Sequence, residues 1–180
     1  MEFYQRAEIK DVLAHLQLLN NPRDDVALLR VINRPARGIG KTTIQKLSEF
    51  ANHHGISLFD AARQCGTIAS ISKRLAVKVA KFVAMMDLIA ESAEAPIEEI
   101  IGNVLSHSAY RDLLVESDAK EDEERLANIE ELLTAARQFD EQNPGYGHLE
   151  EYLEQVALVN DTDDWEDETD RVTLMTMHAA

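Results

Sequence analysis

The residues best suited to chemistry lie in one stretch, Arg34 to Leu47, which reads RPARGIGKTTIQKL. Two glycines, Gly38 and Gly40, enclose a single apolar residue, Ile39, directly before a predicted helix. This pattern is typical of a helix-hairpin-helix element, in which both glycines take backbone angles closed to other residues and let the main chain approach a surface closely. The apolar residue would point inward and hold the turn. The pattern therefore predicts the binding of a ligand by the main chain.

That ligand is expected to be an anion. Free backbone amides from Gly40 to Thr43 lie at the start of the predicted helix, whose dipole favours a negative charge there. The hydroxyls of Thr42 and Thr43 add further donors, and three cations surround the site: Arg34, Arg37 and Lys41. Contacts of this kind reach phosphate and sugar, so we expect duplex binding that is insensitive to base sequence and falls steeply with salt.

Two other interpretations of the stretch remain. In the first, Gly-Ile-Gly is only a tight turn between helices with incidental charge nearby. In the second, the residues from Gly38 to Thr42 resemble the end of a nucleotide-binding P-loop, GxxxxGK[ST]. The P-loop requires a glycine five positions before Gly40, where this chain has Pro35, and no apolar strand precedes the stretch. A nucleotide site is therefore not expected here.

The charge is unevenly distributed. The 180 residues carry a net charge of −15, which would argue against nucleic acid because phosphate contacts come from Lys and Arg. Residues 1–110, however, hold 13 basic and 12 acidic side chains, whereas residues 111–180 hold 5 basic and 21 acidic ones. Between Arg23 and Lys46 there are six basic residues against two acidic ones. A local positive patch therefore remains around the glycines.

Helical periodicity dominates the chain and predicts an all-α fold, a single multi-helix domain. Helices are predicted at about residues 8–19, 25–32, 42–54, 57–64, 72–94, 96–106, 108–117, 119–142 and 148–159. Pro22, Pro35, Gly55 and the turn at residues 143–145 separate several of them. Residues 171–177 alternate in β-prone side chains and predict one stray C-terminal strand, whose partner sheet would lie outside the chain.

Other site classes find little support. Cys65 is the single cysteine and has no histidine close in sequence, so neither a disulfide nor a metal or thiol site is expected. The aspartates between Asp161 and Asp170 lack the glycine and closing glutamate of a calcium-binding loop, so we expect a solvated acidic connector without metal. No apolar run approaches the roughly 18 residues of a membrane helix, and no signal peptide is apparent. A cytoplasmic protein that does not contact membranes is expected.

Several separated segments closely resemble domain 2B of the UvrD, PcrA and Rep helicases of superfamily 1. They are FYQRAEIKDVLAHL at residues 3–16, NPRDD at 21–25, RGIG at 37–40, RLANIEEL at 125–132 and VTLMTMHAA at 172–180. The last resembles the start of helicase motif V. The resemblance implies that residues 1–14 belong to motor domain 2A, 15–160 to the helical 2B domain, 161–171 to an acidic connector and hinge, and 172–180 to a 2A strand.

The resemblance also implies a function. The chain would be a non-catalytic domain that binds duplex DNA and swivels, within an ATP-dependent 3′-to-5′ DNA helicase of repair or replication. Its duplex contacts would be Arg34, Arg37, Gly38, Ile39, Gly40, Lys41, Thr42 and Thr43, with Thr176 and His178 close to single-stranded DNA. No Walker motif is present, so the fragment needs no cofactor, and ATP and Mg²⁺ would be bound elsewhere in the parent protein.

The expected partners are the duplex DNA backbone at a junction of single and double strands, the motor domains of the parent helicase, and repair proteins. An alternative is a protein-interaction module in which the acidic helical face of residues 111–170 is the working surface and the hairpin is structural. A third interpretation, an independent hydrolase, has no nucleophile, base or metal constellation to support it.

Overall fold

The computed structural model describes residues 3–115, 119–145 and 147–163. In this part of the chain every regular element is a helix, as predicted for an all-α fold. The predicted strand at residues 171–177 lies outside the described residues, as do Thr176 and His178. Within the described ranges, no helix is both long and apolar enough to cross a membrane.

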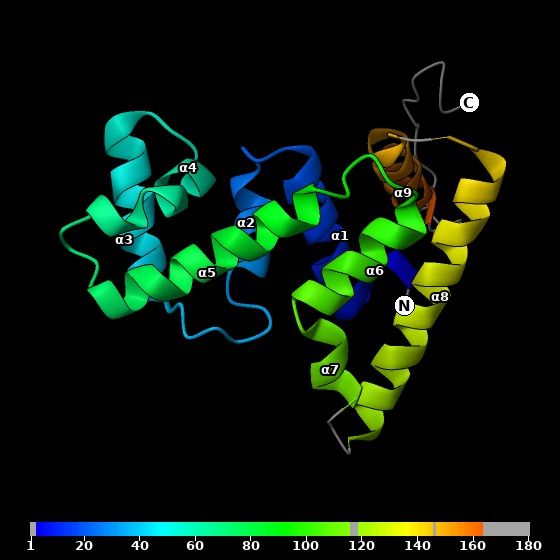
Figure 1. The fold of residues 1–180 in the computed structure, drawn as a ribbon. Helices are drawn as coiled ribbons and strands as arrows, with labels where there is room; N and C mark the ends of the chain where they lie inside the picture. Colours follow the sequence, from blue (N-terminus) through cyan, green and yellow to red (C-terminus); the bar gives the residue numbers. More distant parts are fainter. Residues whose placement is uncertain (1–2, 116–118, 146, 164–180) are drawn as a thin grey trace, which may run out of the picture.

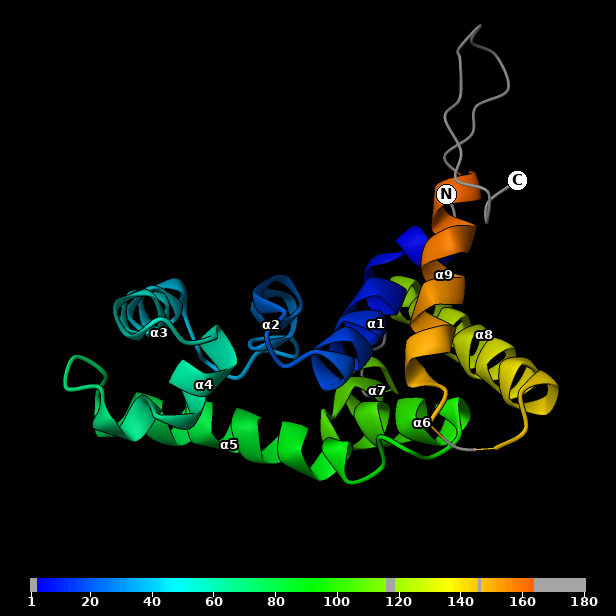
Figure 2. The same ribbon diagram turned by 90° about the horizontal axis from the view of Figure 1, so that it is seen from above.

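One helix, α1 (Ala7–Asn20), lies at the centre of the molecule and follows a 3-10 turn, η1 (Phe3–Gln5). It packs against helices from both halves of the sequence, and Figures 1 and 2 show it between two groups of helices. Its side chains Ile9 and Leu16 are completely buried. The apolar period of three and four residues that predicted this helix therefore faces the common core.

The first group of helices carries the glycine-rich stretch. It comprises α2 (Asp25–Val31), α3 (Lys41–His54), α4 (Leu58–Arg63), the 3-10 turn η2 (Cys65–Thr67) and the long α5 (Lys73–Ala90). Figure 1 shows the connection from α2 to α3 passing beside α5. The buried ring of Phe82 on α5 belongs to the same core cluster as Ile39 in that connection.

The second group carries most of the acidic residues. It comprises α6 (Ile97–His107), α7 (Tyr110–Val115), α8 (Lys120–Gln142) and α9 (Leu149–Asp163). The carboxylate of Asp140 on α8 accepts hydrogen bonds from the amides of Ile97 and Glu98, at 2.8 and 2.9 Å. A side chain from a neighbouring helix thus caps the N-terminus of α6, which follows Pro96.

Local signals determine several helix ends. Asp24 caps α2 by accepting from the amide of Ala27 at 2.9 Å, and Ser57 and Ser72 cap α4 and α5. Gly55 ends α3 in the left-handed conformation, with φ of 64°. At the start of α4 the Ser57 oxygen accepts from the amide of Asp60 at 3.1 Å, and its hydroxyl donates to the Asp60 carboxylate at 2.7 Å.

Two helix ends differ from the prediction by four residues. Helix α5 stops at Ala90 instead of residue 94, because the following residues form successive tight turns and the Ser92 hydroxyl donates to the carbonyl of Ile89 at 2.8 Å. Helix α9 continues past residue 159 to Asp163, so the first residues of the expected acidic connector are helical. Residues 160–163 contain neither glycine nor proline to stop it.

Candidate nucleic-acid interface

The connection between α2 and α3 is organised by a side chain that the sequence analysis did not single out, Asn33. Its Oδ1 accepts hydrogen bonds from the backbone amides of Arg37 at 2.8 Å and Ile39 at 3.1 Å. Ile39 is 1% exposed and belongs to the core, as predicted. The turn is therefore held from both sides, by Asn33 along the main chain and by Ile39 in the core. The peptide bond between Arg34 and Pro35 is cis.

The two glycines have different backbone conformations. Gly38 has φ of +70°, which L side chains rarely adopt, so glycine is required there. Gly40 has φ of −83° and ψ of 171°, which any residue adopts, so the expectation of a special backbone angle at Gly40 was wrong. A Cβ atom added at Gly40 would meet nothing within 4 Å. The backbone at Gly40 therefore borders open space on the side where a side chain would lie.

The N-terminus of α3 supplies fewer free donors than expected. The amides of Thr43 and Ile44 both donate to the carbonyl of Gly40, at 3.0 and 3.2 Å. Among the described residues, the amides of Gly40, Lys41 and Thr42 have no acceptor. These three residues are also exposed. They form the anion-binding part of the element, because unpaired amides at a helix start favour a negative ligand.

The two threonines that follow have different environments. Thr42 is exposed beside the free amides. Thr43 is only 3% exposed, so the structure places its side chain inside the protein, away from the surface formed by its neighbours. A threonine side chain is compatible with either an exposed or a buried environment. The sequence alone therefore does not tell which of the two neighbours is buried.

The three cations of the stretch also lie in different environments. Lys41 is exposed, and 58% of the Arg34 side chain is exposed, with Nη1 3.4 Å from the carboxylate of Asp11. Arg37 instead turns inward. Its Nη1 donates to the carbonyls of Val31 at 2.9 Å, Arg34 at 2.9 Å and Pro35 at 3.2 Å. Arg34 and Lys41 are therefore both exposed, Arg34 beside Asp11 and Lys41 at the start of α3, whereas Arg37 closes the turn.

Burial changes the chemistry of Arg37. Its guanidinium lies over the Phe82 ring, 5.5 Å from the centroid, and Nη2 is 3.4 Å from the sulfur of Met85. This desolvation lowers the pKa of Arg37 to about 10. The group is still charged at neutral pH, so it adds a positive potential behind the hairpin while its hydrogen bonds are directed to the protein.

A buried carboxylate connects the hairpin to α1. Asp11 is 3% exposed and accepts the hydroxyl of Tyr110 at 3.0 Å, and its Oδ1 lies 2.7 Å from Nε of Arg30. Burial, followed by the negative charge of Asp11, raises the pKa of Tyr110. Because Arg34 contacts the same carboxylate, Asp11 links α1, α2, α7 and the start of the hairpin.

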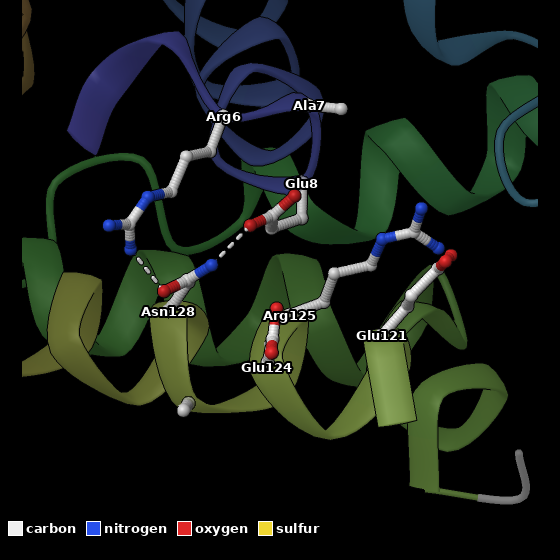
Figure 3. A pocket seen from close by; sticks show the side chains of 8 residues that line it. Arg6, Ala7, Glu8, Glu121, Glu124, Arg125 and Asn128 are labelled. Carbon is white, nitrogen blue, oxygen red and sulfur yellow. Dashed lines mark hydrogen bonds between the residues drawn. The ribbon is translucent and has the colours of Figure 1, made fainter. Parts of the chain in front are cut away.

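A second polar site lies between the start of α1 and α8. Figure 3 shows Arg6 and Glu8 both pointing toward Asn128, which accepts from Arg6 and donates to Glu8 at 2.6 Å. The pocket has a volume of about 590 Å³ and is lined by acidic as well as basic side chains: Arg6, Glu8, Glu121, Glu124 and Arg125 among them. Its mixed charge does not favour phosphate, so it is not a second part of the nucleic-acid interface.

Side chains that could bind a metal ion do not converge in the described part of the chain. Within residues 3–115, 119–145 and 147–163, no three His, Cys, Asp or Glu side chains lie close enough to hold a metal ion. Cys65 is buried, and its thiol donates to the carbonyl of Ala76 at 3.3 Å. The thiol is therefore used in packing, as predicted.

Comparison with known proteins identifies the family. A model described as the UvrD-like helicase C-terminal domain matches residues 1–180. The chain is 38% identical over 185 aligned positions to the ATP-dependent DNA helicase PcrA of Staphylococcus epidermidis, covering 99% of the chain and 25% of that protein. Against the PcrA proteins of Staphylococcus aureus and Leuconostoc citreum the identities are 37% and 35%, with the same 99% of the chain matched to 24% and 25% of those proteins.

The chain thus spans about a quarter of the length of the curated relatives it matches. The similarity is not confined to the glycine-rich turn, since it includes the acidic helices and both ends of the sequence. With a family model that matches every residue and relatives above 30% identity, the chain belongs to the UvrD-like helicase C-terminal domain family.

Proposed function

We propose that this chain is a 2B-type domain that binds the backbone of duplex DNA at a junction of single and double strands. It regulates an ATP-dependent 3′-to-5′ helicase in repair or replication and performs no catalysis itself. The observation that carries the proposal is the group of three unpaired amides at Gly40, Lys41 and Thr42, with open space in front of Gly40. A phosphate approaching this surface meets N–H donors and the positive end of α3.

The surrounding charge supports phosphate as the ligand. Lys41 carries one of the free amides, Arg34 is exposed in the connection that leads to them, and Arg37 adds a charge within the turn. Within the described part of the chain, none of the three free amides lies in a pocket that would enclose a base. Binding is therefore expected to be independent of base sequence and to weaken as salt rises, because each phosphate contact releases counterions.

The rest of the helicase function belongs to the parent protein. The GKT sequence at Gly40 to Thr42 follows helix α2 and a turn, whereas a P-loop follows a β-strand. These residues therefore do not fit a nucleotide site, and ATP and Mg²⁺ are assigned to the motor domains. In this proposal residues 1–14 and 172–180 belong to domain 2A, 15–160 to domain 2B and 161–171 to the hinge.

The proposal is tested with a matched pair of aspartate substitutions at helix N-caps. Gly40→Asp places a carboxylate in front of the three amides, where it caps α3 and repels phosphate. Ala119→Asp makes the same charge change at the start of α8, an exposed position. Binding of each variant to a fluorescent hairpin duplex is measured by anisotropy at several salt concentrations, after thermal unfolding has shown that both fold.

We expect Gly40→Asp to weaken binding at least tenfold and Ala119→Asp to leave it within about twofold, because only Gly40 would contact phosphate. Equal binding by both variants, or no binding by the parent chain at low salt, contradicts the proposal. In that case the acidic face of residues 111–170 becomes the better candidate surface. A protein partner would be sought with variants of exposed glutamates on α8.

A further inference from the structure

A cationic pocket lies beside the hairpin on the surface of α5. It has a volume of about 380 Å³ and is lined by Arg37, Lys78, Lys81, Phe82, Met85 and His107. The aliphatic and aromatic side chains of Phe82 and Met85 are contributed by α5, and His107 comes from the end of α6. Among the described residues that line the pocket, none is acidic. This sets it apart from the mixed pocket of Figure 3.

The two lysines of this pocket have no counter-charge, whereas Arg37 donates to the carbonyls of the turn. Within the described residues neither Lys78 nor Lys81 forms an ion pair, and neither does His107. Lys81 and His107 are exposed, and Lys78 is half-buried. Several positive groups that converge without a counter-charge raise the local potential and favour an anionic ligand.

The pocket is continuous with the hairpin. Nζ of Lys78 lies where a side chain at Gly38 would be, in contact with the position of an added Cβ atom. Arg37, which closes the turn, also forms part of the pocket wall. The pocket therefore adjoins the turn that leads into the three free amides.

We propose that this pocket binds a second backbone phosphate of the same duplex, held by Lys78, Lys81 and His107 above Phe82 and Met85. The inference rests on the proposed function, since it extends the hairpin contact to α5. Duplex DNA carries one negative charge per about 1.7 Å of its axis, so a phosphate bound at the hairpin brings others close to it. Lysine suits this role because its ammonium is a mobile point charge that needs no fixed orientation.

The first test compares two double variants that each remove two positive charges. Lys78→Ala with Lys81→Ala empties the pocket of its lysines, and Lys120→Ala with Arg137→Ala removes two charges from α8, which Figure 1 shows on the other side of the molecule. Duplex affinity is measured by anisotropy at several salt concentrations. We expect the pocket variant to bind about tenfold more weakly. The slope of log K against log salt should fall by roughly 0.9 for each phosphate that the variant no longer neutralises.

The second test follows the imidazole resonances of the parent chain by NMR, with the His107 signal identified by its disappearance in His107→Gln. Duplex is expected to shift the His107 signal and to leave those of His53 and His54, at the end of α3, unchanged. Inorganic phosphate at the same phosphate concentration is expected to shift it much less, because a single free phosphate lacks the neighbouring hairpin contact. An equal shift by inorganic phosphate would assign the pocket to a free anion and overturn the duplex inference.

The outcomes separate this inference from the proposed function. If Gly40→Asp abolishes duplex binding while the pocket variant behaves like the α8 variant, the hairpin proposal stands and the pocket inference is wrong. If the parent chain binds no duplex, both are wrong. Weaker binding and a lower salt slope for the pocket variant alone support the second phosphate contact.

Discussion

The backbone amide of Ile39 donates a hydrogen bond of 3.1 Å to Oδ1 of Asn33, six residues earlier in the chain. The same oxygen accepts the amide of Arg37 at 2.8 Å. One side chain thus satisfies two amides of the turn. The amides of Gly40, Lys41 and Thr42 stay free for a different reason, since the first turn of a helix offers them no acceptor. The order of the loop has its origin in Asn33.

Replacing Asn33 tests this origin. Asn33→Ala removes the acceptor of two amides and is expected to lower the free energy of unfolding by about 1–3 kcal/mol. Asn33→Asp keeps an acceptor oxygen at the same place and should recover most of that stability, while its charge weakens duplex binding. Urea denaturation measures the stability, and fluorescence anisotropy measures the duplex binding. Equal stability of the two variants would show that the acceptor at residue 33 does not order the turn.

The two glycines are expected to respond differently to the same change. Gly38→Ser forces a side chain into a backbone with φ of +70° and should cost about 1–2 kcal/mol. Gly40→Ser retains its φ of −83° and adds an N-cap, so stability should stay equal or rise by about a few tenths of a kcal/mol. Thermal unfolding of both variants measures the two changes in stability. A larger destabilisation at Gly40 than at Gly38 would contradict the observed dihedral angles.

Arg37 and Arg34 form another matched pair, because both can be replaced by lysine with no change in charge. Arg37→Lys removes the planar fork that contacts three carbonyls and is expected to lower the free energy of unfolding by about 1–3 kcal/mol. Arg34→Lys, at a mostly exposed side chain, should change it by less than about 0.5 kcal/mol. The measurement is urea denaturation. Similar destabilisation by the two substitutions would place Arg37 on the surface with Arg34.

His15 on α1 makes stability depend on pH. It is 1% exposed, its Nδ1 donates to the carbonyl of Asp11 at 2.8 Å, and burial lowers its pKa to about 4. The positive charge of Arg37 lowers it further, whereas the hydrogen bond raises it. The pKa of a histidine in the unfolded chain is about 6.5. Between pH 4 and this value the extra proton is therefore bound by the unfolded state. The stability contributed by neutral His15 is complete above about pH 6.5 and is lost as the pH falls toward 4.

Between pH 7 and pH 5 this histidine alone should reduce the free energy of unfolding by about 2 kcal/mol. In His15→Asn, which cannot titrate, that part of the pH dependence should disappear. Urea denaturation at both pH values gives the comparison. The prediction fails if the parent and the variant lose the same stability between the two pH values, since the titration would then come from other groups.

The sequence predicted those features that depend on neighbouring residues. The left-handed end at Gly55 and the buried Ile39 each follow from side chains within a few positions. The family resemblance, which comparison with known proteins confirms at the level of the UvrD-like helicases, also followed from short motifs. Helix ends and family motifs can therefore be predicted from short stretches of the sequence.

Features that depend on distant residues did not follow from the sequence. The inward orientation of Arg37 requires Phe82 and Met85 on a helix more than forty residues later. The proximity of Lys78 to Gly38 likewise arises only when α5 packs beside the turn. Thr42 and Thr43 look equivalent in the sequence, and only the position of the core buries one of them. Tertiary packing assigned these side chains their environments.

The central position of α1 has a consequence for how the chain acquires its structure. This helix packs against α9 as well as α2, and Asn128 on α8 bonds to Glu8 across 120 positions of sequence. During synthesis from the N-terminus, the apolar surface of α1 has no α8 or α9 to cover it until nearly all the described residues have been made. Helix α1 therefore completes its packing only after α8 and α9 have been made, and until then its apolar side chains are open to non-native contacts.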